Sequence, residues 1–242
     1  MPLIVYCCVT YCPSAFGPKT QDHWTALHFV NAVKGTPLAG YAYLPLRPGG
    51  LARAGDAVRI DRSSANAAPL WFARLAVHAL PWRDFLPVGL VPLPDAACDL
   101  AASRPPHTLA LADALTSELG ADVATVDALR WARPMPKAHS ADGSRDSQVL
   151  YGRLRVRGAR RTLDGRRVVL VDDVVVTGAH LRAAAAFLTD CGAHVACAIC
   201  AVRATDEVVR QGDALTPSSL VLPDFQSDPD WLLPGIYDGL EL

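Results

Sequence analysis

The chain alternates between short apolar runs and segments in which apolar residues recur every three or four positions. The short runs are rich in β-branched and aromatic residues, which is typical of buried strands. The periodic segments fit amphipathic helices, because a period of 3.6 residues puts their apolar side chains on one face. These patterns predict strands over residues 3–11, 41–46, 88–93, 122–131, 166–171 and 194–202, and helices over residues 23–34, 66–80, 108–119 and 178–190.

Residues that commonly begin and end helices flank these segments. Asp22 can cap the helix that starts at residue 23, and Pro69 suits the first turn of the next helix. Gly35, Gly120 and Gly192 each follow a predicted helix, where glycine accepts the left-handed backbone of a helix end. From residue 88 onward strands and helices alternate, which predicts an α/β fold with a mostly parallel sheet flanked by helices.

Breaker-rich segments suggest how the chain is organised. Residues 133–146 are polar and contain prolines and a glycine, which predicts a loop. Repeated prolines after residue 206 prevent a long helix there, so we expect that segment to be loop-like. We expect a small N-terminal lobe or hood over residues 1–84, a core domain over residues 85–205 and a C-terminal extension over residues 206–242.

Charge and composition narrow the class of protein. The 242 residues are 51% hydrophobic and 19% charged, with a formal net charge of -1, which is an ordinary globular balance. A dedicated nucleic-acid binder usually carries a basic excess, so this class is not favoured. The arginine-rich segment from Arg153 to Arg167 nevertheless leaves nucleic-acid binding open.

Cysteine usage and hydropathy bear on location and metal binding. No apolar stretch reaches the roughly 18 residues of a membrane-spanning helix, so we expect a cytoplasmic protein that has no membrane partner. The seven cysteines are an odd number scattered through apolar runs, which favours reduced thiols. Cys7, Cys8, Cys12 and His23 fit no common zinc-finger spacing, so we expect no protein-bound metal.

The segment of residues 166–181 contains the most informative chemistry. A buried strand runs into the adjacent acids Asp172 and Asp173, and a short loop with Thr177 and Gly178 leads into a helix. Ligands of parallel sheets bind at the carboxyl ends of strands, where these acids would lie. The free N–H groups of a helix N-terminus suit a phosphate, and paired carboxylates accept hydrogen bonds from vicinal hydroxyls. A sugar with a 5′-phosphate satisfies both requirements.

This segment resembles the motif with which type I phosphoribosyltransferases bind 5-phosphoribosyl 1-pyrophosphate (PRPP). The run over residues 154–167 before the motif, and the Val91-Pro-Leu-Pro94 stretch, are similar to the ComF-like subgroup of this family. The resemblance implies that the protein binds PRPP with Mg²⁺. It also implies transfer of the 5-phosphoribosyl group to a nitrogenous acceptor, with release of pyrophosphate.

The resemblance also implies roles for individual residues. Asp172 and Asp173 would hold the ribose 2′- and 3′-hydroxyls. Leu93 and Asp95 would belong to the loop that approaches pyrophosphate, and Lys137 and Arg145 would cover pyrophosphate from the loop of residues 133–146. The residues expected around the 5′-phosphate are Val176, Thr177, Gly178, Ala179 and His180.

The chain departs from the family pattern at several places. Val176 and His180 stand where the family usually has hydroxyl residues, and residues 103–107 replace an expected Arg-Gly-Phe-Asn-Gln segment. In the first turn of a helix the dipole disfavours a protonated imidazole, so without ligand we expect His180 to be neutral at pH 7.

These departures leave other functions open. One is a regulatory protein that binds PRPP or a nucleotide with reduced catalysis, and another is a competence- or defence-associated protein. The acceptor cannot be read from the sequence, and a homodimer or a larger assembly is compatible with it.

Overall fold

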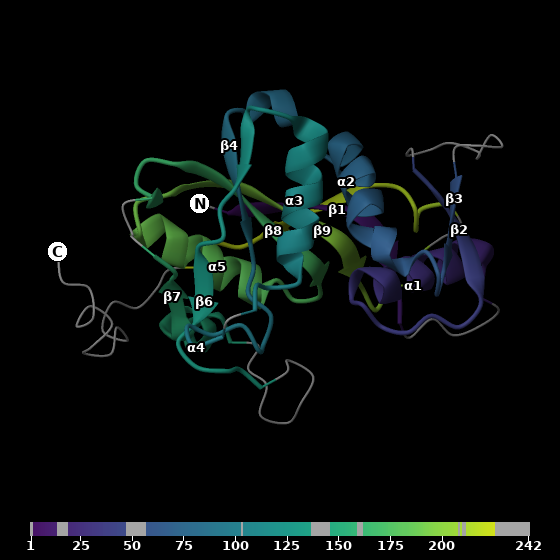
Figure 1. The fold of residues 1–242 in the computed structure, drawn as a ribbon, viewed down its shortest axis with the longest axis horizontal. Coiled ribbons are helices and arrows are strands. Elements are labelled where there is room, and N and C mark those ends of the chain that lie inside the picture. The colour runs from purple at the N-terminus through teal and green to yellow at the C-terminus, as the bar shows by residue number, and fades with distance from the viewer. Residues whose placement is uncertain are drawn as a thin grey trace.

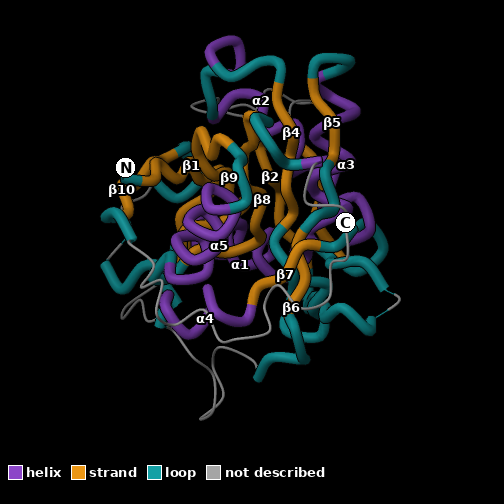
Figure 2. Tube along the Cα trace, turned by 90° about the vertical axis from the view of Figure 1, so that its left-hand side faces the viewer, coloured by secondary structure: helices purple, strands orange, loops and turns teal. Residues whose placement is uncertain are grey.

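The core of the protein is a single six-stranded sheet. The computed structural model describes residues 2–13, 19–46, 57–102, 104–136, 146–158, 162–207, 209 and 212–225. The sheet has the order β10-β1-β9-β8-β4-β5, which Figure 2 shows from one edge of the sheet to the other. Its strands are β1 (Leu3–Tyr11), β4 (Val88–Pro92), β5 (Val123–Thr125), β8 (Arg167–Val175), β9 (His194–Ala204) and β10 (Ser218–Leu222). All neighbours are parallel except β1 and β10, which are antiparallel.

Helices cover both faces of this sheet (Figure 1). The first face packs on α1 (Gln21–Val33), α2 (Ala68–Ala79) and α3 (Thr108–Leu119), and the second on α4 (Ser147–Arg153) and α5 (Ala179–Asp190). Along β8, Val169 and Val171 join the first hydrophobic cluster, whereas Val168 and Leu170 join the second. Burial on both faces explains why this strand is almost continuously apolar. The predicted α/β fold with a mostly parallel, helix-flanked sheet is confirmed.

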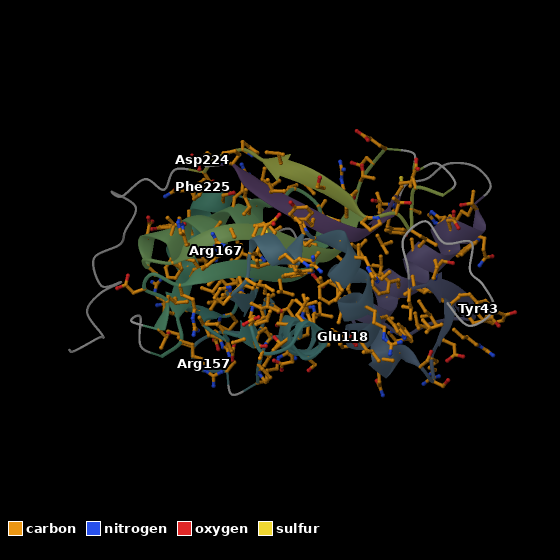
Figure 3. All side chains as sticks on the ribbon, turned by 90° about the horizontal axis from the view of Figure 1, so that it is seen from above. Tyr43, Glu118, Arg157, Arg167, Asp224 and Phe225 are labelled. Carbon is orange, nitrogen blue, oxygen red and sulfur yellow. The ribbon has the colours of Figure 1, made fainter. Side chains whose placement is uncertain are left out.

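Two small antiparallel pairs lie at opposite ends of the molecule (Figure 1). One pairs β2 (Tyr41–Pro45) with β3 (Ala57–Asp61), and the other pairs β6 (Leu129–Trp131) with β7 (Leu154–Val156). In Figure 3, Tyr43 of β2 marks one end, and Phe225 lies well toward the other. Short 3-10 turns at Ala65–Ala67 and Trp82–Asp84 precede and follow α2.

Two predicted boundaries are wrong for local reasons. The strand expected over residues 122–131 is two strands in different sheets. The hydrogen bond from the Val126 N–H to the Leu90 oxygen is the last between this segment and β4, and beyond it β6 pairs with β7 instead. Helix α1 is capped by Thr20, whose hydroxyl accepts the His23 N–H at 3.3 Å. Asp22 therefore lies inside the first turn, and its carboxylate accepts the N–H of Gly212 at 2.7 Å.

The central sheet takes strands from all three predicted segments. Strand β1, from the expected N-terminal lobe, lies between β9 and β10. The loop-like prediction for the tail is wrong over β10, which lies between Pro217 and Pro223. These prolines prevent a helix but permit a short strand at the edge of the sheet. Among the described residues, no helix is long and apolar enough to cross a membrane.

Candidate functional site

The acid pair lies on β8 just beyond the end of the neighbouring strand β4. Strand β4 ends at Pro92, which pairs with Val171, the residue before the acids. Strand β8 continues beside β9 to Val175, past the predicted end at residue 171. Asp172 and Asp173 thus have a strand neighbour on one side only, and they lie at the carboxyl edge of a parallel sheet, where ligands of this fold class bind.

Asp172 is the buried member of the pair. Its side chain is turned into the protein, and the residue is only 8% exposed. Its Oδ1 accepts the backbone N–H of Asp173 at 2.9 Å. Burial, followed by the charge of Asp173, raises the pKa of Asp172 well above its ordinary value. Asp172 therefore keeps a proton more readily than a solvated aspartate.

Asp173 has the opposite electrostatic setting. Its Oδ1 accepts the Val174 N–H at 2.6 Å, and its Oδ2 lies 3.1 Å from Nε2 of His107. Burial acts to raise the pKa of Asp173, but the hydrogen bond and charge of His107, together with Lys34, outweigh it. The net shift of the Asp173 pKa is downward, so Asp173 is the ionised member of the pair.

His107 is a site residue that sequence reasoning missed. It follows Pro105 and Pro106 immediately before α3, and it is 66 residues away from its partner Asp173 in the sequence. The hydrogen bond with Asp173 is the main cause that raises the pKa of His107 above 6.5. The only signal in the sequence was that residues 103–107 depart from the family pattern. Nothing there indicates that the imidazole points at Asp173.

The loop after β4 lies at the same edge. Leu93 is buried, its N–H donates to the Val171 oxygen at 3.0 Å, and its own oxygen accepts the Thr108 hydroxyl at 2.5 Å. The Oδ1 of Asp95 accepts the Ala97 N–H at 3.0 Å and a guanidinium hydrogen bond from Arg104 at 2.8 Å. Its Oδ2 accepts the backbone N–H of His107 at 3.3 Å. Both oxygens of Asp95 therefore help to fix the loop.

The loop between β8 and α5 begins with exposed residues, and it ends at a glycine with a left-handed backbone. Val176 is 61% exposed and Thr177 is also exposed, and the Thr177 hydroxyl accepts the Ala179 N–H at 3.4 Å. Gly178 has a φ of +73°, which a side chain would strain. A Cβ at Gly178 would also lie 2.4 Å from Cδ1 of Leu222, so β10 packs directly against this loop.

His180 packs against an aromatic ring. Its ring stacks on Trp131 with the centroids 5.0 Å apart and the planes at 24°. Its Nε2 is buried and has no hydrogen-bond partner among the described residues. Burial is the largest influence on His180 and lowers its pKa to about 4, in line with the expected neutral imidazole. Trp131 also donates its Nε1–H to the backbone oxygen of Asp95 at 3.1 Å, which links His180 to the loop after β4.

Other predicted residues lie apart from this cluster or outside the described residues. Lys137 and Arg145 are outside them, so their roles stay predictions. In the arginine-rich segment, Arg155 donates to the oxygens of Gly152 and Leu154, and Arg157 pairs with Asp127. Over the described ranges, no cluster of three or more His, Cys, Asp or Glu side chains could hold a metal ion.

Two sequence comparisons with known proteins agree on one family. The profile of the phosphoribosyl transferase domain matches residues 108–226, which run from α3 past β10 and contain the acid pair and the loop before α5. Adenine phosphoribosyltransferase of Mycolicibacterium smegmatis (strain ATCC 700084 / mc(2)155) is 36% identical over 129 residues, covering 48% of this chain and 68% of that protein. A crystal structure of adenine phosphoribosyltransferase from Thermoanaerobacter pseudethanolicus ATCC 33223 has a TM-score of 0.40 at 19% identity, covering 72% of this chain and 87% of that one.

Proposed function

Because the chain belongs to the phosphoribosyltransferase family, we propose that it binds Mg²⁺-PRPP and transfers the 5-phosphoribosyl group to a nitrogenous acceptor, releasing pyrophosphate. One observation carries the proposal. Strand β8 places two adjacent acids at the open carboxyl edge of the sheet. The short loop that follows leads to helix α5, which begins after Gly178. This arrangement provides hydrogen-bond acceptors for a diol and donors for a phosphate, a few residues apart.

The acid pair binds the ribose in this proposal. Each carboxylate oxygen can accept two hydrogen bonds, so the oxygens of Asp173 keep acceptor capacity after binding Val174 and His107. Asp172, which keeps a proton more readily, can donate as well as accept. A vicinal diol donates and accepts hydrogen bonds, so the pair orients the ribose and thereby its C1.

The loop over residues 176–180 anchors the 5′-phosphate. The first N–H groups of α5 have no partners within the helix, and they carry the positive end of the helix dipole. Thr177 adds a hydroxyl, and Gly178 allows the phosphate to approach the backbone closely. Val176, Ala179 and His180 contribute through their backbone.

In this proposal the loop of Leu93 and Asp95 contacts the departing pyrophosphate, and Lys137 and Arg145 supply cations for it. The bond from C1 to the pyrophosphate oxygen breaks through an oxocarbenium-like state, and its electron pair leaves with pyrophosphate. The acceptor nitrogen forms the new bond to C1 with its lone pair and releases its proton. The protein positions C1 and stabilises the charge on pyrophosphate. Bound Mg²⁺ would neutralise part of that charge, and it would be held by the oxygens of PRPP, since the described residues offer no metal cluster.

The acceptor and the subgroup are the finer parts of the proposal. Similarity to a protein named adenine phosphoribosyltransferase favours a purine base such as adenine. We propose that the N-terminal lobe or hood expected over residues 1–84 recognises this base through α1, the β2–β3 pair and α2, since β1 belongs to the central sheet. Assignment to the ComF-like subgroup stays a prediction.

Calorimetry with Mg²⁺-PRPP tests the proposal. Wild type should bind, and the double variant Asp172→Asn/Asp173→Asn should lose detectable binding while it still unfolds cooperatively. Asp206→Asn, which changes an exposed aspartate after β9, is the matched control and should bind like wild type. Retained affinity in the double variant would overturn the assignment of the acid pair.

A second function is favoured by the phosphate loop itself. The exposed Val176 provides no hydroxyl for a phosphate, and His180 packs on Trp131. Both features suit a protein that binds PRPP for regulation and has reduced catalysis. A screen for pyrophosphate release over purine bases, other bases and amines separates the two functions. Binding of PRPP without release for any acceptor would favour the regulatory protein.

A further inference from the structure

His107 lies between two carboxylates that belong to different parts of the site. Its Nε2 is 3.1 Å from Oδ2 of Asp173 on β8, and its Nδ1 is 3.6 Å from Oδ2 of Asp95 in the loop after β4. Two further hydrogen bonds fix the backbone around His107. Its backbone N–H donates to Asp95, and the hydroxyl of the next residue, Thr108, donates to the Leu93 oxygen.

The charged groups around His107 favour its cationic form. Asp172 and Asp173 face it from β8, Asp95 faces it from the loop after β4, and Arg104 is paired with Asp95 at 2.8 Å. The charge of Lys34, which follows the last residue of α1, also lowers the pKa of Asp173. A neutral imidazole has one N–H, whereas an imidazolium can donate from Nε2 to Asp173 and also face Asp95 with a second N–H at ion-pair distance.

We propose that His107 is a positioning residue of the PRPP site, an imidazolium that holds Asp173 ionised and oriented and links it to the loop of Asp95. The proposal rests on the proposed function. Without this cation, Oδ2 of Asp173 would lose its partner, and Asp173 would lose the main influence that keeps it ionised beside Asp172. With His107 charged, Asp173 at the ribose and Asp95 near the pyrophosphate belong to one connected set of side chains.

The affinity for Mg²⁺-PRPP as a function of pH tests this role. The variant is His107→Gln, which keeps a neutral donor of similar reach, and the readout is the ratio of its Kd to that of wild type. This ratio cancels the titration of the substrate's own phosphates. It should be about tenfold or more at pH 6.5, because a charge-assisted hydrogen bond is lost, and it should fall toward one at pH 9.

Two further variants make the test specific. His107→Lys keeps a cation and should lose less affinity at pH 9 than at pH 6.5 relative to wild type. His194→Gln changes an exposed histidine at the amino end of β9, the opposite edge of the sheet, and should match wild type at every pH. Nitrogen-15 NMR of the wild-type His107 ring tests the charge without any substitution. Both ring nitrogens should carry protons at pH 6.5.

The outcomes separate this inference from the proposed function. If wild type does not bind Mg²⁺-PRPP, the proposed function fails and the inference fails with it. If wild type binds but the ratio is the same at pH 6.5 and 9, His107 has only a structural role and the inference alone is overturned. A neutral His107 ring at pH 6.5 would overturn it equally, even if the glutamine variant did not fold.

Discussion

Asp172 and Asp173 are chemically identical residues with opposite protonation behaviour. Alternation along β8 turns Asp172 into the protein, where solvent cannot stabilise its charge, and leaves Asp173 beside His107. One acid is therefore inclined to keep a proton and the other to lose it. Such a split lets a pair of acids act together as donor and acceptor toward a diol.

Asp172→Asn should stabilise the fold, increasingly so as pH rises. The folded-state pKa of Asp172 is raised, so its contribution to stability is complete below about pH 4 and is lost as pH rises through the folded-state pKa. Asparagine keeps an oxygen for the Asp173 N–H and removes this loss. We expect a clear gain in the free energy of unfolding at pH 8 and little at pH 4. Urea unfolding at both pH values measures it, and a gain that does not grow with pH would contradict the burial argument.

His180 should make the protein sensitive to acid. Its folded-state pKa of about 4 is below the ordinary value of 6.5, so the unfolded chain takes up a proton first. The stability contribution of His180 is complete above about pH 6.5 and is lost as pH falls toward 4. Between pH 7 and 5, wild type should lose about 1–2 kcal/mol more than His180→Gln. Chemical unfolding at the two pH values checks this, with His194→Gln as the control. Equal losses in wild type and His180→Gln would show that the ring is solvated.

At the scale of elements, β10 has a role that its sequence did not suggest. It pairs with β1 at the edge of the sheet, and Leu222 packs against Gly178 in the loop before α5. The loop therefore relies on a strand from the C-terminal segment for its shape. Successive side chains of β10 point to opposite faces of the sheet, so Leu222 is only 5% exposed whereas its neighbour Val221 is 65% exposed.

Leu222→Ala should lower stability and weaken PRPP binding, whereas Val221→Ala should do neither. Removing a buried leucine side chain costs about 2–3 kcal/mol in the free energy of unfolding. An exposed valine on the same strand should cost no more than about 0.5 kcal/mol. Urea unfolding and calorimetry with Mg²⁺-PRPP measure both effects. If Leu222→Ala lowered stability without changing PRPP affinity, the loop would be shaped by its own residues rather than by β10.

At the scale of the whole molecule, the boundaries expected at residues 84 and 205 do not divide the central sheet. The sheet contains strands from all three expected segments. Strands β1 and β10 pair with each other, and β1 pairs with β9 of the core. The hydrophobic cluster on the first face likewise combines α1 and α2 with α3 and β8. We therefore propose that the three segments are functional regions of one cooperative unit.

A cooperative unit should unfold in a single transition. Trp24, Trp71 and Trp82 report on the N-terminal segment and its junction with the core, and Trp131 reports on the core. Tryptophan fluorescence and far-UV circular dichroism should give coincident unfolding curves in urea. Two separate transitions would show instead that the N-terminal segment folds independently.

Local chemistry in the sequence determined much of the fold and the centre of the site. Continuous apolar runs predicted β1, β4, β8 and β9, since strands buried on both faces must be apolar throughout. The predicted bounds of α3 match the structure because Gly120 ends it locally. The acid pair and the loop of residues 176–180 were predicted as the centre of the candidate site for the same reason, because strand, acids, glycine and helix are contiguous.

Only the tertiary structure decided how distant residues complete the site. His107 meets Asp173, and Leu222 meets Gly178, because chain folding brings separate segments to one edge of the sheet. The opposite pKa shifts of Asp172 and Asp173 have the same origin, since loss of solvent and the charges of partners depend on packing. A local pattern records which residues are adjacent in the chain. The electrostatics of this site depend on which residues are adjacent in space.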